Sequence, residues 1–506
     1  MWIVLQEQIK RKSTLTFLAH ILMSVFGLIS LFFVKKYMGY EAVGMIAFAT
    51  SYMMLFSIIG DLGFGMAHLK RVGEGLDLAK CNGTIISIKL FLTFLMASAF
   101  IAWMLIQKFI LGYAFESKEM EMIVYIIFLQ YIIFNLGNPL KNIFVAKLEI
   151  AKSQLSRLTQ RFVVMVLKIF VVIIGLNVIY LAYAELTGAI VLLILFLLLM
   201  RTKPISKPDK EYIMKYTTFA IPMIFIGIIA ILSQNIDKLM LGFFFSSYEV
   251  GIYAIPQRLT SVLLIVSTSI TGILFVSFSA LYNNKELKLI RDRSIKAEKY
   301  ISLILLPIVI TTLIFSKPLL SIFGNDIAPS IPVLEIIIIS VYFDAIRNPF
   351  SVQILSTGHV KFGFYLGIFT LVLNFILNLV LIPKNIGGVT LFGLGALGAA
   401  YALMLSFMVR AIIARLAAFK ITHTKISFRI FLHFIAGIVF YSIVNFLQAI
   451  IQSFFLFAFV YLLLVVLLFF GLLYIFGEFT REDFEYLINA LNPKQMRDYV
   501  SQELRK

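Results

Sequence analysis

Basic side chains interrupt the long apolar runs of this sequence, and their chemistry needs an explanation. Four of them lie deep within such runs: Lys89, Lys168, Arg258 and Arg347. A charged side chain at the centre of a bilayer costs about 2.5–3.5 kcal/mol on insertion scales, so residues of this kind usually serve a function. Ammonium and guanidinium groups in a site of low dielectric bind phosphate and carboxylate groups. These four residues therefore predict a binding site for an anionic substrate.

Acidic residues in the same runs offer two further interpretations. Asp237, Asp344 and Glu185 are candidates for binding a coupling ion. Alternatively, an acid neutralises a nearby base. Asp344 and Arg347 are three residues apart, which makes them neighbours on a helix, and Asp237 can meet Arg258 from the following helix.

Signals for catalysis or for a metal centre are weak. The five histidines are scattered, and the single cysteine, Cys81, excludes an internal disulfide and a cysteine-based metal site. Residues 393–398 match G-x-G-x-x-G, but they open an apolar helix without a βαβ context, which favours close helix packing. No Walker A, H-E-x-x-H or G-x-S-x-G sequence is present. We therefore expect no catalytic residues, no metal ligands, no cofactor and no enzyme activity.

The elements that carry these residues are membrane helices. The chain has 506 residues, of which 61% are hydrophobic and 14% charged, whereas soluble domains average about 45–50% and about 25%. Continuous apolar runs of about 20 residues predict an all-α polytopic membrane protein of about fourteen transmembrane helices. The expected spans are 13–34, 43–64, 82–107, 121–145, 158–176, 179–200, 213–241, 250–281, 298–315, 331–356, 360–382, 392–416, 430–449 and 452–476.

The net charge of +18 does not require a nucleic-acid partner, because the basic residues gather in alternate loops. Examples are the segments 201–215 and 285–299. This is the positive-inside pattern, which predicts a cell-membrane protein with both termini in the cytoplasm, where anionic lipids bind the loops. Lys141 and Arg410 lie near predicted cytoplasmic helix ends, where long side chains can reach the headgroups.

The sequence also contains an internal repeat. Tyr40–Gly44 resembles Ser247–Gly251, and Asn138–Leu140 resembles Asn348–Phe350, at offsets of 207 (247 minus 40) and 210 (348 minus 138) residues. Near-equal offsets predict two six-helix bundles related by an axis along the membrane normal. The predicted domains are an N-terminal bundle (1–200), a C-terminal bundle (213–416), two further transmembrane helices (430–476) and a cytoplasmic amphipathic tail (480–506).

Several of these motifs also carry a resemblance to a known family. They are Tyr40–Gly44 with Asp61-Leu62-Gly63, then Asn235–Gly242, Val250–Ala254 and Gln257-Arg258-Leu259. In these segments and in its twelve-plus-two layout, the chain resembles the polysaccharide (lipid-linked oligosaccharide) flippases of the multidrug/oligosaccharidyl-lipid/polysaccharide exporter superfamily.

The resemblance implies a flippase with a central cationic cavity that moves a polyprenyl (di)phosphate-linked oligosaccharide to the outer leaflet by alternating access, for surface glycan assembly. Other glycan-assembly membrane proteins are candidate partners, besides membrane lipids. The alternative within the superfamily is a multidrug or cation antiporter, which the excess of buried bases disfavours. A membrane glycosyltransferase or ligase would normally need a large extramembrane loop. The longest predicted outer loop, residues 108–120, is too short for one.

Overall fold

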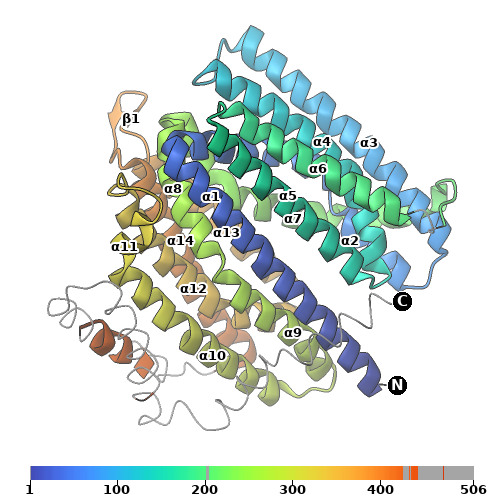
Figure 1. Cartoon of the computed structure of the whole chain (residues 1–506). Coiled ribbons are helices and arrows are strands. Elements are labelled where there is room, and N and C mark those ends of the chain that lie inside the picture. The colour runs from blue at the N-terminus through green and yellow to red at the C-terminus, as the bar shows by residue number, and fades with distance from the viewer. Residues whose placement is uncertain (1, 201–203, 425–431, 434, 443–470, 472–506) are drawn as a thin grey trace. The chain divides into compact units, whose positions relative to one another are not determined.

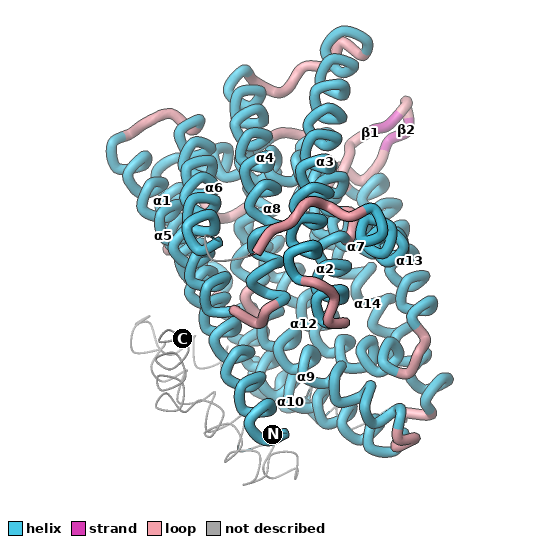
Figure 2. Tube along the Cα trace, turned by 90° about the vertical axis from the view of Figure 1, so that its right-hand side faces the viewer, coloured by secondary structure: helices cyan, strands magenta, loops and turns pink. Residues whose placement is uncertain are grey.

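Helices make up most of the described chain. The computed structural model describes residues 2–200, 204–424, 432–433, 435–442 and 471. In these residues the one sheet is a hairpin of two short strands, β1 (Asn385–Ile386) and β2 (Val389–Thr390) (Figure 2). The fold is therefore all-α, as the continuous apolar runs predict.

The order of the helices follows the predicted spans closely (Figure 1). They are α1 (Trp2–Asp61), α2 (Phe64–Gly73), α3 (Leu78–Leu105), the π-helical turn η1 (Ile106–Ile110), α4 (Lys118–Ala146), α5 (Ile150–Ile174), α6 (Ile179–Met200), α7 (Lys210–Phe244), α8 (Ser247–Ser261), α9 (Leu264–Asn283), α10 (Leu287–Ile314), α11 (Ser316–Ser321), α12 (Ser330–Ser356), α13 (Val360–Leu381) and α14 (Gly395–Thr422). Eight of the described helical segments are long and apolar enough to cross a membrane, so the chain is a multi-pass membrane protein.

The expected count of fourteen spans is not confirmed. Half of the predicted span 430–449, all of 452–476 except residue 471, and the whole predicted tail 480–506 lie outside the described residues. The expected spans 13–34 and 43–64 run together as α1, which departs from helical geometry at Gly39 (φ 83°, ψ −175°). Glycine adopts this backbone conformation without a Cβ clash, so the helical direction can change there. The expected span 250–281 is divided into α8 and α9.

By contacts, the described residues form two compact units. Unit 1 holds Met1–Ile255 and Phe375–Ala399, and unit 2 holds Pro256–Asn374 and the described residues from Ala400 onwards. The division cuts through α8, α13 and α14, so these units are not the two sequence repeats. The predicted domain boundaries therefore stay a prediction.

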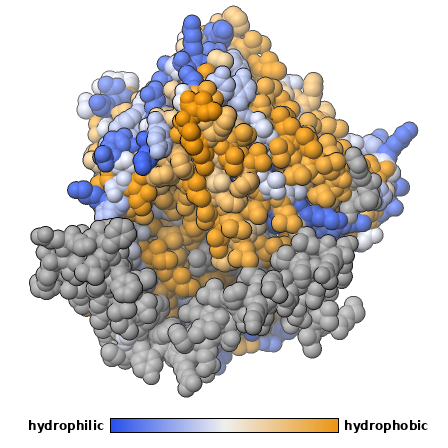
Figure 3. Space-filling model, viewed as in Figure 1, coloured by the Kyte–Doolittle hydropathy of each residue, from blue (hydrophilic) through white to orange (hydrophobic). Residues whose placement is uncertain are grey.

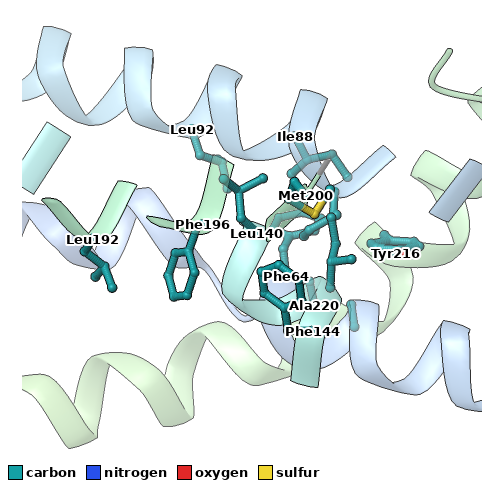
Figure 4. Packing of buried hydrophobic residues seen from close by; sticks show 13 residues of the cluster. Phe64, Ile88, Leu92, Leu140, Phe144, Leu192, Phe196, Met200, Tyr216 and Ala220 are labelled. Carbon is teal, nitrogen blue, oxygen red and sulfur yellow. The ribbon is translucent and has the colours of Figure 1, made fainter. Parts of the chain in front are cut away.

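Unit 1 is held together by apolar side chains from five helices. Phe64 of α2, Leu92 of α3, Phe144 of α4, Phe196 of α6 and Tyr216 of α7 pack into one cluster (Figure 4). Lipid tails are as apolar as these side chains, so close packing rather than escape from water joins helices inside a bilayer. The cluster also contains the residues directly before Lys89 and Lys141, so it fixes the backbone at both bases.

Apolar residues also cover much of the coloured part of the face that Figure 3 shows. Phe94 is 70% exposed, Phe109 75% and Ile173 72%. On a soluble protein such a surface would promote aggregation, whereas in a bilayer it contacts lipid.

The first pair of repeated motifs meets at a close crossing of α1 and α8 in unit 1. A Cβ on Gly44 would lie 1.6 Å from the carbonyl oxygen of Ser247, and a Cβ on Gly251 would lie 2.1 Å from that of Tyr40. Gly44 matches Gly251 in the repeat, and Tyr40 matches Ser247. The contact is therefore reciprocal, as in an isologous interface between two-fold-related copies.

Glycine also permits close packing at the start of α14. A Cβ on Gly398 would lie 2.6 Å from the carbonyl oxygen of Leu381 in α13. The packing interpretation of residues 393–398 is thus confirmed at this glycine.

Candidate functional site

Lys89 lies inside unit 1 with an acid beside it. Its side chain is 1% exposed, and its ammonium group pairs with the carboxylate of Asp61 and donates a hydrogen bond to the carbonyl oxygen of Gly60 at 3.0 Å. Asp61 itself is 54% exposed. The pair joins α3 to the end of α1, so Lys89 has both an electrostatic partner and a fixed position.

Lys168 likewise has a carboxylate partner. Its Nζ lies 2.6 Å from Glu185 Oε1, and both side chains are largely buried. Arg161 approaches the other oxygen of Glu185 at 3.8 Å. Glu185 of α6 thus lies between two bases of α5, which makes it a structural counter-ion in this conformation.

Two further bases of unit 1 have no acidic partner among the residues that the structure describes. Lys141 of α4 and Arg157 of α5 are half-buried, and each has neither an ion pair nor a side-chain hydrogen bond within the described part of the chain. Lys141 lies within electrostatic range of Arg157, Lys89 and Asp61. We call Lys89, Lys141 and Arg157, with Asp61, the basic cluster. It carries more positive than negative charge, so it suits an anion.

Sequence reasoning missed this part of the site. Lys141 was expected at a helix end, and Arg157 precedes the expected span 158–176. A signal was nevertheless present, because Arg157, Arg161 and Lys168 are spaced by four and seven residues, which places them on one face of α5. That stripe of three bases identifies the polar face of the helix.

The remaining predicted bases belong to unit 2. Arg347 Nη2 lies 2.7 Å from Asp344 Oδ1, so the predicted pairing three residues apart is present. Arg410 Nη1 lies 3.7 Å from the same oxygen. Arg258, in the last turn of α8, is exposed. Lys89 and Lys168 thus lie in one compact unit, and Arg258 and Arg347 in the other.

Two polar side chains that the sequence did not indicate contact Asp237 of α7. The residue is 1% exposed. Tyr253 Oη donates a hydrogen bond to Asp237 Oδ2 at 2.6 Å, and Asn378 Nδ2 donates one to Oδ1 at 2.7 Å. Asn378 is 141 residues away in the sequence, so only the tertiary structure brings these groups together.

A metal centre is not formed by the residues that the structure describes. No group of three or more His, Cys, Asp or Glu side chains there is placed to hold a metal ion.

Comparisons with known proteins show the family of the chain. The model of a family described as "Polysaccharide biosynthesis protein" matches residues 13–332. The chain is 23% identical over 193 residues to the "Probable flippase AglR" of Haloferax volcanii, a match that covers 37% of this chain and 38% of that protein. It is 24% identical over 136 residues to the "Teichuronic acid biosynthesis protein TuaB" of Bacillus subtilis, covering 26% and 28%.

The fold has counterparts among solved structures. The lipid II flippase MurJ, in an inward closed conformation, superposes with a TM-score of 0.73 at 14% sequence identity. The match covers 91% of this chain and 98% of that one. At this identity the likeness concerns the fold alone.

Proposed function

This chain belongs to the polysaccharide biosynthesis protein family, and we propose that it flips a polyprenyl (di)phosphate-linked oligosaccharide from the cytoplasmic to the outer leaflet of the cell membrane by alternating access. Two lines of reasoning support this proposal: the membership itself, and the excess of positive charge in unit 1. The names of the two relatives, a probable flippase and a teichuronic acid biosynthesis protein, agree with it.

The basic cluster is the observation that carries the proposal. Moving a charged headgroup out of water has a large desolvation free energy. Fixed opposite charges lower this free energy because they replace the interactions with water. Lys141 and Arg157 have no acid of their own among the described residues, so their charges are free to interact with a ligand. Lys89 adds a third positive charge, although Asp61 partly neutralises it.

The same balance of charge weighs against the alternative of a multidrug or cation antiporter. A site for organic cations should be lined mainly by acids. Around Lys141 the electrostatic neighbours are two bases and one acid. An anionic headgroup is the better complement.

For ion coupling, Asp237 is the candidate that the geometry favours. Its carboxylate is fully buried and is positioned by Tyr253 and Asn378. Asp344 and Glu185 lie at short distance from arginine and lysine respectively, which leaves less room for a cation beside those two carboxylates. We keep the cytoplasmic position of both termini and the involvement of further glycan-assembly proteins as parts of the proposal.

The test is a leaflet assay in reconstituted vesicles with a fluorescently labelled lipid-linked oligosaccharide. We expect the double variant K141Q/R157Q to lower the flipping rate at least tenfold, which corresponds to about 1.4 kcal/mol. The matched control is K152Q, because Lys152 is a base of α5 that is 42% exposed and pairs with Glu149. Unchanged flipping by a folded K141Q/R157Q protein would contradict the proposal.

A further inference from the structure

Unit 2 contains a group of charges that the basic cluster does not include. Arg347 contacts Asp344 Oδ1 through Nη2 at 2.7 Å and through Nε at 3.1 Å. Arg410 approaches the same oxygen at 3.7 Å. We call Arg347 and Arg410 the arginine pair. Two guanidinium groups thus share one carboxylate oxygen, and the three side chains together carry one net positive charge.

Arg347 is held rigidly in this arrangement. Its side chain is 5% exposed, and it donates hydrogen bonds to Ser351 and to Asn348 Oδ1, the latter at 3.0 Å. Asn348 in turn donates to Ser267 Oγ at 2.9 Å. A guanidinium fixed by such a network loses little entropy when it binds an anion.

Arg410 has unused hydrogen-bonding capacity. Its side chain is 26% exposed, while its Nε is buried without a hydrogen-bond partner in the described structure. The charged groups that act on it are Arg347, which repels it, and Asp344, which attracts it. The buried Nε of Arg410 is a donor without an acceptor among the described residues, and it lies on a cation next to a second cation, Arg347. An acceptor with negative charge would satisfy this donor and reduce the repulsion.

We propose that the arginine pair is a second anion site, which takes the phosphate or diphosphate group of a ligand, and that Asp344 occupies the arginine fork until the anion arrives. A planar guanidinium matches phosphate oxygens in the way it matches a carboxylate. Asp344 contacts both arginines through Oδ1, so a phosphate that binds the pair competes with it. The existence of this second site does not depend on the proposed flippase function. Only the expectation that the bound anion is a lipid headgroup rests on that function.

The test is isothermal titration calorimetry on the full chain in detergent, with inorganic pyrophosphate and farnesyl diphosphate as separate probes. We expect two pyrophosphates per chain for the unaltered protein and one for R410Q. R410K keeps the charge without the fork, so it should retain the second site with weaker binding. The control is K361Q, which removes an exposed base of the same unit and should leave both sites intact.

A variant of Asp344 gives the more decisive measurement. D344N removes the competing negative charge, so we expect the affinity of the second site to rise about tenfold. A purely structural ion pair predicts no such gain. If R410Q does not fold, D344N decides the question alone: a gain in affinity supports the site, and unchanged or lost binding overturns it.

The remaining outcomes separate this inference from the proposed function. K141Q/R157Q should leave binding at the arginine pair intact. If the unaltered protein binds one anion, and both R410Q and K141Q/R157Q abolish that binding, there is no second site and the proposal is wrong. A single bound anion that only R410Q abolishes would support the arginine pair and remove the basic cluster from the proposal. Binding of farnesyl diphosphate alone identifies a lipid headgroup, and binding of pyrophosphate as well shows that the phosphates suffice.

Discussion

Gly44 and Gly251 occupy reciprocal positions at one helix crossing, each beneath a carbonyl oxygen of the other helix. The two residues are equivalent in the internal repeat, which makes their contact symmetric in sequence as well as in space. The crossing leaves no room for any side chain, since the distances that a Cβ would have, 1.6 Å and 2.1 Å, lie far inside van der Waals contact.

We expect G44A and G251A each to destabilise the protein, because the helices must separate to admit a methyl group. Overpacking of this kind costs about 1–3 kcal/mol. Thermal unfolding in detergent measures the effect. The control is G227A in α7, since a Cβ there meets nothing within 4 Å. A G44A protein as stable as G227A would show that the crossing is looser than described.

Glu185 should matter more to stability than Lys168. Loss of the carboxylate in E185Q leaves Lys168 and Arg161 without their acid and should cost about 3 kcal/mol. K168M should cost less, because Arg161 remains near Glu185. The double variant K168M/E185Q should be more stable than E185Q alone. Thermal unfolding of the three variants tests this order, and a K168M protein less stable than E185Q would reverse it.

His68 should make stability depend on pH. It lies in α2, outside the candidate membrane spans, and is 0% exposed, with its Nδ1 2.9 Å from Tyr216 Oη. Burial lowers the pKa of His68 from 6.5 to about 4. The folded state therefore binds fewer protons than the unfolded state between these values, so stability falls as the pH drops from 6.5 to 4, by about 3 kcal/mol at most.

Thermal unfolding between pH 7.5 and pH 4 measures this dependence. H68Q should flatten it, because glutamine keeps a polar partner for Tyr216 without a titrating group. The control is H359Q, which replaces an exposed histidine and should leave the profile unchanged. An identical pH profile for H68Q and the unaltered protein would assign the acid sensitivity to other groups.

Asp237 should be needed for ion dependence rather than for folding. In D237N the side chain keeps its size and one acceptor oxygen, so we expect folded protein whose flipping no longer responds to a cation gradient. Parallel leaflet assays with and without sodium or proton gradients provide the measurement. D292N, a change at an exposed acid, should retain any response of the unaltered protein. Gradient-dependent flipping by D237N would remove Asp237 as the coupling residue.

The sequence by itself determined the class of the protein and the course of its helices. Apolar runs of sufficient length require helices in a bilayer, because each helix satisfies its own backbone hydrogen bonds. The expected span 179–200 therefore coincides with α6. The contact of Asp344 with Arg347 was also predictable, since residues three apart are neighbours on a helix regardless of the remaining fold.

Only the tertiary structure decided which bases keep an uncompensated charge. The sequence favoured Lys89 as the deeper base and placed Lys141 near a helix end, yet Asp61 of another helix pairs with Lys89 and no described acid pairs with Lys141. Asp237 obtains Asn378 from 141 residues away. Such pairings depend on which faces of the helices pack together. Close contacts, such as that of Gly44 with α8, determine which faces these are. Hydropathy measures how apolar a segment is, and it carries no information about the direction in which a charged side chain points.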